Sequence, residues 1–248
     1  MLGTRLVVVA DAHLGAGAPS DEEAFLDFVA AVPSLGDCLL INGDLFEFWF
    51  AYRRAVPRRS VRVAGALAVL ARRMPVVMTG GNHDRWGDSF WDRDAGITFA
   101  PHETRFAIDG CEVLATHGDG LAEEHRSAAF MHRLTRHPFT AAAFRFIHPD
   151  AGIWLVDRIS RFLADSTRDP AVLERAEIRQ REWAHRRLET EPGLGLVVMA
   201  HTHRAVLTEP APGRRYLNPG AWLDGYRYAV VTAAGAELRQ FRPGSATA

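Results

Sequence analysis

Residues of the types that bind metal ions occur in five short motifs along the chain. In order, they are Asp11-Ala12-His13, Gly43-Asp44, Gly81-Asn82-His83-Asp84, His117-Gly118-Asp119 and His201-Thr202-His203. Together they offer imidazole nitrogens, carboxylate oxygens and one carboxamide oxygen, and no thiolate. That mixture suits a pair of hard or borderline divalent ions such as Mn²⁺, Fe²⁺ or Zn²⁺. Two such ions about 4 Å apart are a common device for in-line attack on a phosphate ester.

Short, mostly apolar runs precede these motifs, and each is typical of a buried β-strand. The runs cover residues 6–10, 38–41, 76–79, 112–116 and 196–200. Open α/β sheets place their sites at the carboxyl ends of strands. The spacing therefore predicts that the five motifs converge on one site.

The first three motifs supply the oxygen ligands and one imidazole. Asp11 and His13 are two residues apart, so at a strand end both side chains can face the same way. Asp44 follows a glycine in a tight turn, and its two oxygens allow one carboxylate to bridge two cations. Asn82 adds a neutral oxygen that does not repel phosphate. These four residues are candidate metal ligands.

Histidines complete this site and supply a proton donor. We expect His201 and His203 to point to the same face of a strand, and His117 to offer a further nitrogen. His83 adjoins the carboxamide ligand without needing to bind metal, and Asp84 is expected to fix its tautomer and raise its basicity. In this mechanism a hydroxide held by two ions attacks phosphorus, and His83 protonates the leaving oxygen.

Length and composition fit a single domain spanning residues 1–248. The net charge of −1 gives no reason to expect a nucleic-acid partner. The two cysteines, Cys38 and Cys111, are expected to be buried thiols. The first predicted strand follows Met1 almost at once, and no apolar run is long enough to span a bilayer. We expect a cytoplasmic location, and no motif indicates an obligate protein partner.

Helical patterns separate the predicted strands. One covers residues 21–31, with Ser20 or Asp21 as its N-cap, and another covers residues 60–74. Short strand-like stretches alternate with turns from about residue 216 to 241. The pattern predicts an α/β fold with two sheets packed face to face and helices outside.

The segment from about residue 121 to 192 is helical, rich in arginine and aromatic residues, and holds no candidate ligand motif. It has two interpretations. One is a helical insertion that caps the site. The other is ordinary packing of helices on the sheet.

The five motifs resemble those of the calcineurin-like metallophosphoesterase family, whose pattern is DxH, GD, GNH(D/E), H and GHxH. Ala200 stands where that family usually has glycine. The resemblance implies a four-layer αββα sandwich with two divalent ions. It also implies one metal site made of Asp11, His13, Asp44 and His203, and a second made of Asp44, Asn82, His117 and His201. Mn²⁺ is the expected metal, and Fe²⁺, Zn²⁺ and Co²⁺ accept the same ligands.

A narrower resemblance is to the UDP-2,3-diacylglucosamine pyrophosphatase branch of lipid A synthesis. It is carried by the sequences GDLFEFW at residues 43–49, HGDG at 117–120 and AHTHR at 200–204. That branch has a helical insertion after its HGD motif, over a lipid substrate. The resemblance implies a UDP-linked diacyl sugar as substrate, UMP and a lipid monophosphate as products, and a peripheral contact with the inner membrane surface. His83 departs from it, because the branch usually has arginine there.

Four further residues flank the motifs as candidate substrate contacts: Trp49, Arg85, His125 and Arg204. Packing or surface roles are the alternative for each. Two other functions stay open. One is a metallophosphoesterase acting on another phosphodiester, nucleotide or phosphoprotein, and the other is a non-catalytic scaffold on the same fold.

Overall fold

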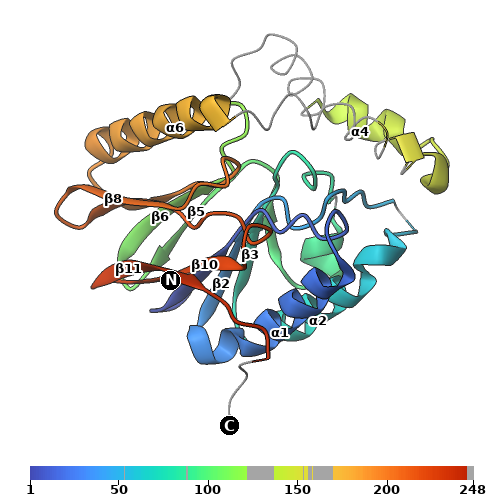
Figure 1. The fold of residues 1–248 in the computed structure, drawn as a ribbon, viewed down its shortest axis with the longest axis horizontal. Helices are drawn as coiled ribbons and strands as arrows, with labels where there is room; N and C mark the ends of the chain where they lie inside the picture. The colour runs from blue at the N-terminus through green and yellow to red at the C-terminus, as the bar shows by residue number, and fades with distance from the viewer. Residues whose placement is uncertain are drawn as a thin grey trace.

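Two β-sheets packed face to face form the centre of the protein. The computed structural model describes residues 1–52, 54–87, 89–121, 137–152, 154–155, 158 and 170–244. Helices α1 (Pro19–Leu35) and α2 (Val61–Ala71) lie outside one sheet, and α6 (Pro170–Thr190) lies outside the other (Figure 1). The layers therefore run helix, sheet, sheet, helix, and the predicted α/β sandwich is confirmed.

The first sheet carries three of the five motif loops. Its order is β11 (Gly235–Gln240), β10 (Arg227–Thr232), β1 (Leu6–Val9), β2 (Cys38–Asn42), β3 (Val76–Thr79) and β4 (Thr98–Ala100). Strands β1 to β4 are parallel, whereas β10 runs antiparallel to β1. Parallel strands end at a common edge, so the loops after β1, β2 and β3 are neighbours.

The second sheet carries the other two motif loops. Its order is β5 (Glu103–Ile108), β6 (Cys111–Thr116), β7 (Leu194–Val198), β9 (Arg214–Asn218) and β8 (Val206–Ala211). The central strands β6, β7 and β9 are parallel, and the two edge strands pair antiparallel. The loops after β6 and β7 therefore leave from one edge.

Burial on both faces explains the continuous apolar runs. In β1, Val7 and Val9 pack into the core beneath α1 and α2, while Leu6 and Val8 pack into the core between the sheets. Successive side chains of a strand point to opposite faces. A strand covered on both sides thus needs apolar residues at every position.

Helix α1 begins earlier than its sequence pattern predicted. Its N-cap is Ala18 and its first residue is Pro19, whose fixed φ suits the first helical turn. Asp21 lies inside the helix, and its carboxylate accepts a hydrogen bond from the Ala18 N–H at 2.9 Å. The predicted N-cap at Ser20 or Asp21 was therefore wrong, because a side chain in the first turn reaches back to the cap. The helix predicted at 60–74 is a 3₁₀ turn, Arg58–Ser60, followed by α2.

Helix α6 belongs to the sandwich itself. Ala184 and Leu188 on α6 join a core cluster with residues of the second sheet, among them Leu114, Val197 and Tyr216. Of the two interpretations of residues 121–192, ordinary packing on the sheet therefore describes α6. A helical insertion that caps the site stays a prediction for the residues before α6.

Helix α4 (Pro138–Phe144), which precedes α6, contacts the loops near the motifs. Phe144 in this helix packs against Phe50 at 4.8 Å and Trp86 at 5.4 Å between ring centroids. Phe50 follows the Gly43-Asp44 motif, and Trp86 follows the Gly81–Asp84 motif. Among the described residues, no helix combines the length and apolar character needed to cross a membrane.

Candidate metal centre

The motif loops adopt backbone conformations that ordinary residues rarely take. Among the described residues, seven non-glycine residues have positive φ, and five of them are candidate ligands. These five are Asp11 at 50°, His13 at 44°, Asp44 at 51°, His201 at 71° and His203 at 59°. Left-handed backbone is unfavourable for residues with a Cβ and collects at functional sites. The loops after β1, β2 and β7 thus turn sharply where their strands end.

His201 and His203 reach the site from a loop, and not from one face of a strand as the sequence predicted. Strand β7 ends at Val198, two residues before the predicted end, so His201 and His203 lie in the following loop. They do not share a strand face, and they join different groups of donors. The strand-face prediction was therefore wrong, although both imidazoles reach the motif cluster.

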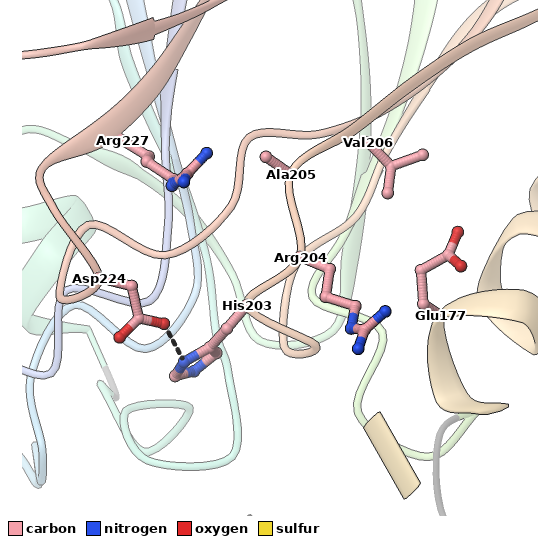
Figure 2. Close-up of a pocket in the computed structure, with 7 residues that line it drawn as sticks. All are labelled: Glu177, His203, Arg204, Ala205, Val206, Asp224 and Arg227. Atoms are coloured by element: carbon pink, nitrogen blue, oxygen red, sulfur yellow. Dashed lines mark hydrogen bonds and ion pairs between the residues drawn. The ribbon is translucent and has the colours of Figure 1, made fainter. Parts of the chain in front are cut away.

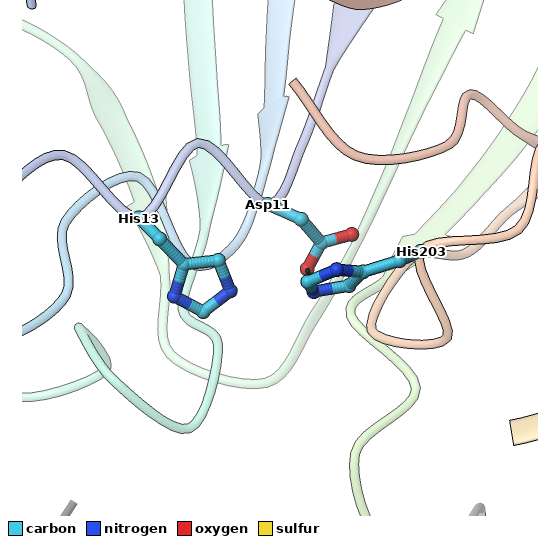
Figure 3. Close-up of side chains that lie close together, drawn as sticks. All are labelled: Asp11, His13 and His203. Atoms are coloured by element: carbon cyan, nitrogen blue, oxygen red, sulfur yellow. Dashed lines mark ion pairs between the residues drawn. The ribbon is translucent and has the colours of Figure 1, made fainter. Parts of the chain in front are cut away.

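Side chains from the loops form three overlapping groups of donor atoms. Within each group, one ligand atom per residue lies within 4.8 Å of the others. The groups are Asp11, His13 and His203; His13, Asp44 and His83; and Asp44, His117 and His201. In Figure 3 the imidazoles of His13 and His203 flank the Asp11 carboxylate, and His203 Nε2 lies 3.9 Å from Asp11 Oδ1. The first group contains three of the four ligands predicted for one metal site, without Asp44, and the third contains three of the four predicted for the other, without Asn82.

Asp44 stands between these two groups. Its Oδ2 lies 3.1 Å from His117 Nε2 and 3.8 Å from His13 Nε2. Its Oδ1 accepts a hydrogen bond from the His83 main-chain N–H at 3.0 Å. At Gly81, a Cβ would overlap the Asp44 carboxylate. Only glycine at that position lets the two loops approach closely enough.

Three imidazoles are oriented by hydrogen bonds that their Nδ1 atoms donate. His13 Nδ1 donates to Glu47 Oε2 at 3.1 Å, and His203 Nδ1 donates to Asp224 Oδ2 at 3.2 Å. His117 Nδ1 donates to a main-chain carbonyl at the end of β2 at 2.9 Å. Such partners fix the tautomer and leave Nε2 available as a metal ligand.

The charges of the cluster shift its pKa values strongly. Burial lowers the pKa of His13, but the Glu47 hydrogen bond and the charges of Asp44 and Asp11 outweigh it and raise the pKa to about 9. Burial likewise lowers the pKa of His117, which Asp44 and then Asp11 raise to about 9. Burial opposes ionisation of Asp44, yet the neighbouring imidazoles hold its pKa well below the usual value. Without metal, these histidines are therefore cations beside carboxylates.

One buried oxygen fits a metal ligand directly. Asn82 Oδ1 is buried, and among the described residues it has no hydrogen-bond partner. A buried acceptor without a partner costs free energy that a cation offsets. Together with the carboxylates and imidazoles of the other motifs, this oxygen gives a donor set whose chemistry fits two divalent ions.

Comparisons with known proteins agree with this geometry. The family model of the calcineurin-like phosphoesterases matches residues 4–205. The chain belongs to the calcineurin-like phosphoesterase family. This membership indicates a hydrolase, and the clustered histidines and aspartates indicate divalent metal binding.

Two curated relatives match this phosphoesterase over more than nine tenths of its length. A UDP-2,3-diacylglucosamine hydrolase from Porphyromonas gingivalis is 25% identical, covering 92% of this chain and 94% of that protein. One of the same name from Xanthomonas oryzae pv. oryzae is 27% identical, covering 94% and 97%. Among solved structures, vacuolar protein sorting 29 from Cryptosporidium parvum gives a TM-score of 0.47 at 15% identity, covering 99% and 95%.

His83 and Asp84 of this phosphoesterase do not pair as the sequence predicted. His83 Nδ1 donates to the Glu47 main-chain carbonyl at 2.6 Å. Asp84 is fully buried and accepts hydrogen bonds from the main-chain N–H groups of Leu45 at 2.7 Å, Gly81 at 2.8 Å and Asp44 at 3.3 Å. The prediction that Asp84 fixes the His83 tautomer was wrong. Asp84 instead joins the two motif loops, and a carbonyl orients His83.

The predicted substrate contacts fall in different surroundings. Trp49 is fully buried and packs against Trp91 at 4.7 Å between ring centroids, so its position favours the alternative of a core role. Arg85 is 6% exposed and forms an ion pair with Asp119. Its position also favours a structural role. His125 lies outside the described residues.

Arg204, by contrast, borders an open pocket beside the metal centre. The pocket has a volume of about 430 Å³, and Figure 2 shows Arg204 facing it from the loop that carries His203. It is lined by Glu177, His203, Arg204, Ala205, Val206, Asp224 and Arg227. Arg204 therefore keeps its candidacy as a substrate contact.

Sequence reasoning missed three residues that support the centre. Glu47 and Asp224 hold histidines by Nδ1, and Gln180 on α6 donates to the Gly118 carbonyl at 3.2 Å, next to His117. Glu47 lies within the GDLFEFW sequence, which offered a signal. Asp224 and Gln180 follow no motif, because only the folded chain brings them to the site.

Proposed function

We propose that this phosphoesterase hydrolyses the pyrophosphate bond of UDP-2,3-diacylglucosamine, releasing UMP and 2,3-diacylglucosamine 1-phosphate. The observation that carries a two-metal hydrolase is the pair of donor groups on either side of Asp44, whose Oδ2 lies 3.8 Å from His13 Nε2 in one and 3.1 Å from His117 Nε2 in the other. The name shared by relatives that span nearly the whole chain supports the substrate. Two divalent ions, Mn²⁺ in the first instance, would occupy the centre, and Fe²⁺, Zn²⁺ or Co²⁺ would fit the same donors.

The residues divide between two metal positions. Asp11, His13 and His203 would hold the first ion, with Asn82, His117 and His201 holding the second and Asp44 shared between them. When bound, such ions polarise phosphoryl oxygens and lower the pKa of water. The main-chain N–H groups that hold the Asp11 and Asp44 carboxylates keep these ligands in place before substrate arrives.

His83 is the proposed general acid. Its side chain is 23% exposed at the edge of the centre, and the Glu47 carbonyl holds Nδ1, which leaves Nε2 to face the substrate side. A proton on Nε2 would pass to the oxygen that leaves with the departing phosphate. Because the Asp44 carboxylate also accepts from the His83 main chain, the acid is fixed relative to the shared metal ligand.

Helix α4 supports a cap over the lipid. Phe144 anchors α4 on the motif-flanking loops, while Phe139 and Phe146 on the same segment are 77% and 93% exposed. Exposed aromatic rings suit acyl chains or the interfacial zone of a bilayer. We propose that the insertion caps the site and that the enzyme works in the cytoplasm, at the periphery of the inner membrane.

The test is turnover of UDP-2,3-diacylglucosamine with Mn²⁺, followed by mass spectrometry of UMP, beside bis-p-nitrophenyl phosphate as a generic diester. We expect the lipid to react much faster, and Phe144→Ala to slow the lipid more than the generic diester. Turnover of the generic diester alone would favour another phosphate ester as substrate. No turnover of either by the metal-loaded protein would favour the scaffold function.

A further inference from the structure

The first and third donor groups differ in the acceptors that bind the Nδ1 atoms of their histidines. Both imidazoles of the first group donate from Nδ1 to a carboxylate, His13 to Glu47 and His203 to Asp224. In the other group, His117 donates to a neutral main-chain carbonyl. The Asp11 carboxylate does not distinguish the groups, because its Oδ1 lies 3.9 Å from His203 Nε2 and 3.8 Å from His117 Nε2.

Main-chain hydrogen bonds tie both backing carboxylates to the loop that carries Asp11 and His13. The Glu47 N–H donates to the Leu14 carbonyl at 3.1 Å. One residue before Asp224, the Leu223 N–H donates to the Asp11 carbonyl at 3.2 Å. The first group, its loop and its two carboxylates thus form one hydrogen-bonded unit.

From this arrangement we infer that Glu47 and Asp224 are positioning residues that make the first metal position the tighter of the two. The inference rests on the proposed two-metal function and concerns how that centre fills. Each carboxylate holds one imidazole with Nε2 towards the ion and increases the electron donation of that ring. Asp11 lies near both positions, 3.9 Å from His203 Nε2 and 3.8 Å from His117 Nε2, so the difference between the two positions comes from the two carboxylates, Glu47 and Asp224, that accept from Nδ1 only at the first. The centre therefore loads in order, first position before second.

The size of the effect follows from the general behaviour of such partners. Loss of a hydrogen-bonding group behind a metal-binding histidine typically weakens metal affinity about 10–100-fold. Asp224 is 56% exposed at its side chain and Glu47 is 32% exposed, so water can replace part of each interaction. We therefore expect the loss at Glu47 to be the larger of the two.

The experiment is stepwise binding of Mn²⁺ to the metal-free full-length protein, measured by isothermal titration calorimetry with electron paramagnetic resonance of free Mn²⁺. His203→Ala and His201→Ala assign the two steps, because each removes a ligand of one position. We expect His203→Ala to remove the tighter step and His201→Ala the weaker.

The deciding variants are Glu47→Ala and Asp224→Ala, with Glu47→Gln and Asp224→Asn as conservative partners. We expect each alanine variant to weaken the tighter step about 10–100-fold and leave the weaker step in place. The amide variants should lose less, because an amide oxygen still accepts from Nδ1. Melting temperatures of the metal-free variants separate this effect from misfolding.

Surface carboxylates provide matched controls. Asp150 faces His148 at 3.8 Å but is 91% exposed, and Glu237 pairs with Arg239 and is 67% exposed. Asp150→Asn and Glu237→Gln should leave both steps unchanged. If the Glu47 and Asp224 variants weaken both steps equally, or only the weaker one, the inference is overturned while the two-metal function stands. If the unmodified protein takes up no metal, the proposed function itself fails.

Discussion

Replacing Asp84 by alanine tests whether this carboxylate is a clamp between loops. It is fully buried and accepts two short hydrogen bonds, from the N–H groups of Leu45 at 2.7 Å and Gly81 at 2.8 Å. A hydrogen bond to a charged group contributes about 1.5–3 kcal/mol, so the pair contributes about 3–6 kcal/mol. Burial and the charge of Asp44 raise the pKa of Asp84 to about 6, which shows that the carboxylate is itself held at a cost.

Subtracting that cost leaves an expected loss of about 2–4 kcal/mol in the free energy of unfolding. For a chain of this size, the loss lowers the melting temperature by roughly 5–15 °C. The clamp also holds the loops of Asp44 and Asn82 together, so bound metal should fall with stability. Asp84→Asn, which keeps the shape and one good acceptor, should lose less of both.

The assay combines thermal unfolding of the metal-free protein with metal content after gel filtration. A different result would refute the clamp. If Asp84→Ala melts within about 1 °C of the unmodified protein and keeps its metal, yet turns over slowly, then Asp84 acts on the chemistry of His83. That outcome would restore the role that the sequence alone predicted.

Three further perturbations test other parts of the centre. His83→Ala should keep its fold and metal but lower kcat about 10²–10⁴-fold, and unchanged turnover would remove the general-acid assignment. Because the pKa values of His13 and His117 are raised to about 9 without metal, both side chains are protonated at pH 7.5. Metal binding should therefore release protons and become tighter as the pH rises towards 9. Calorimetry in two buffers of different ionisation enthalpy counts the released protons, and a count of zero would contradict the charged cluster. Gly81→Ala should abolish binding of at least one metal because its Cβ overlaps the shared carboxylate, whereas Gly65→Ala, with open space around it on α2, should keep both metals and raise stability by about 0.5–1 kcal/mol.

The sequence predicted the sandwich and the meeting of the motifs because both depend on local, periodic signals. Continuous apolar runs such as that around Val7 require burial on both faces, and a ligand just after such a run must stand at a sheet edge. It did not predict where the loops turn. His201 and His203 reach the site through left-handed backbone after a strand that ends early, and nothing in a strand pattern encodes that turn.

The sequence also did not predict hydrogen bonds between residues that are far apart along the chain. The adjacency of His83 and Asp84 suggested a pair, yet the carboxylate found main-chain N–H groups about forty residues away along the chain, at Leu45. Asp224 meets His203 across a loop that carries no motif. Helix α6 looked like part of the insertion because its sequence is rich in arginine, and only its contacts with Tyr216 and other sheet residues assign it to the sandwich. Composition reveals the polar face of a helix but not the surface that its apolar face covers.

The left-handed backbone at five candidate ligands sets function against stability. Each such residue costs about 1–2 kcal/mol relative to glycine, roughly 5–10 kcal/mol in all, which is comparable to the whole stability of a typical domain. A selection for heat resistance alone would therefore enrich glycine at Asp11, His13, Asp44, His201 and His203 and so dismantle the metal centre. A random-mutagenesis library screened only for stability would therefore reveal this site as the positions at which metal-binding side chains are replaced by glycine.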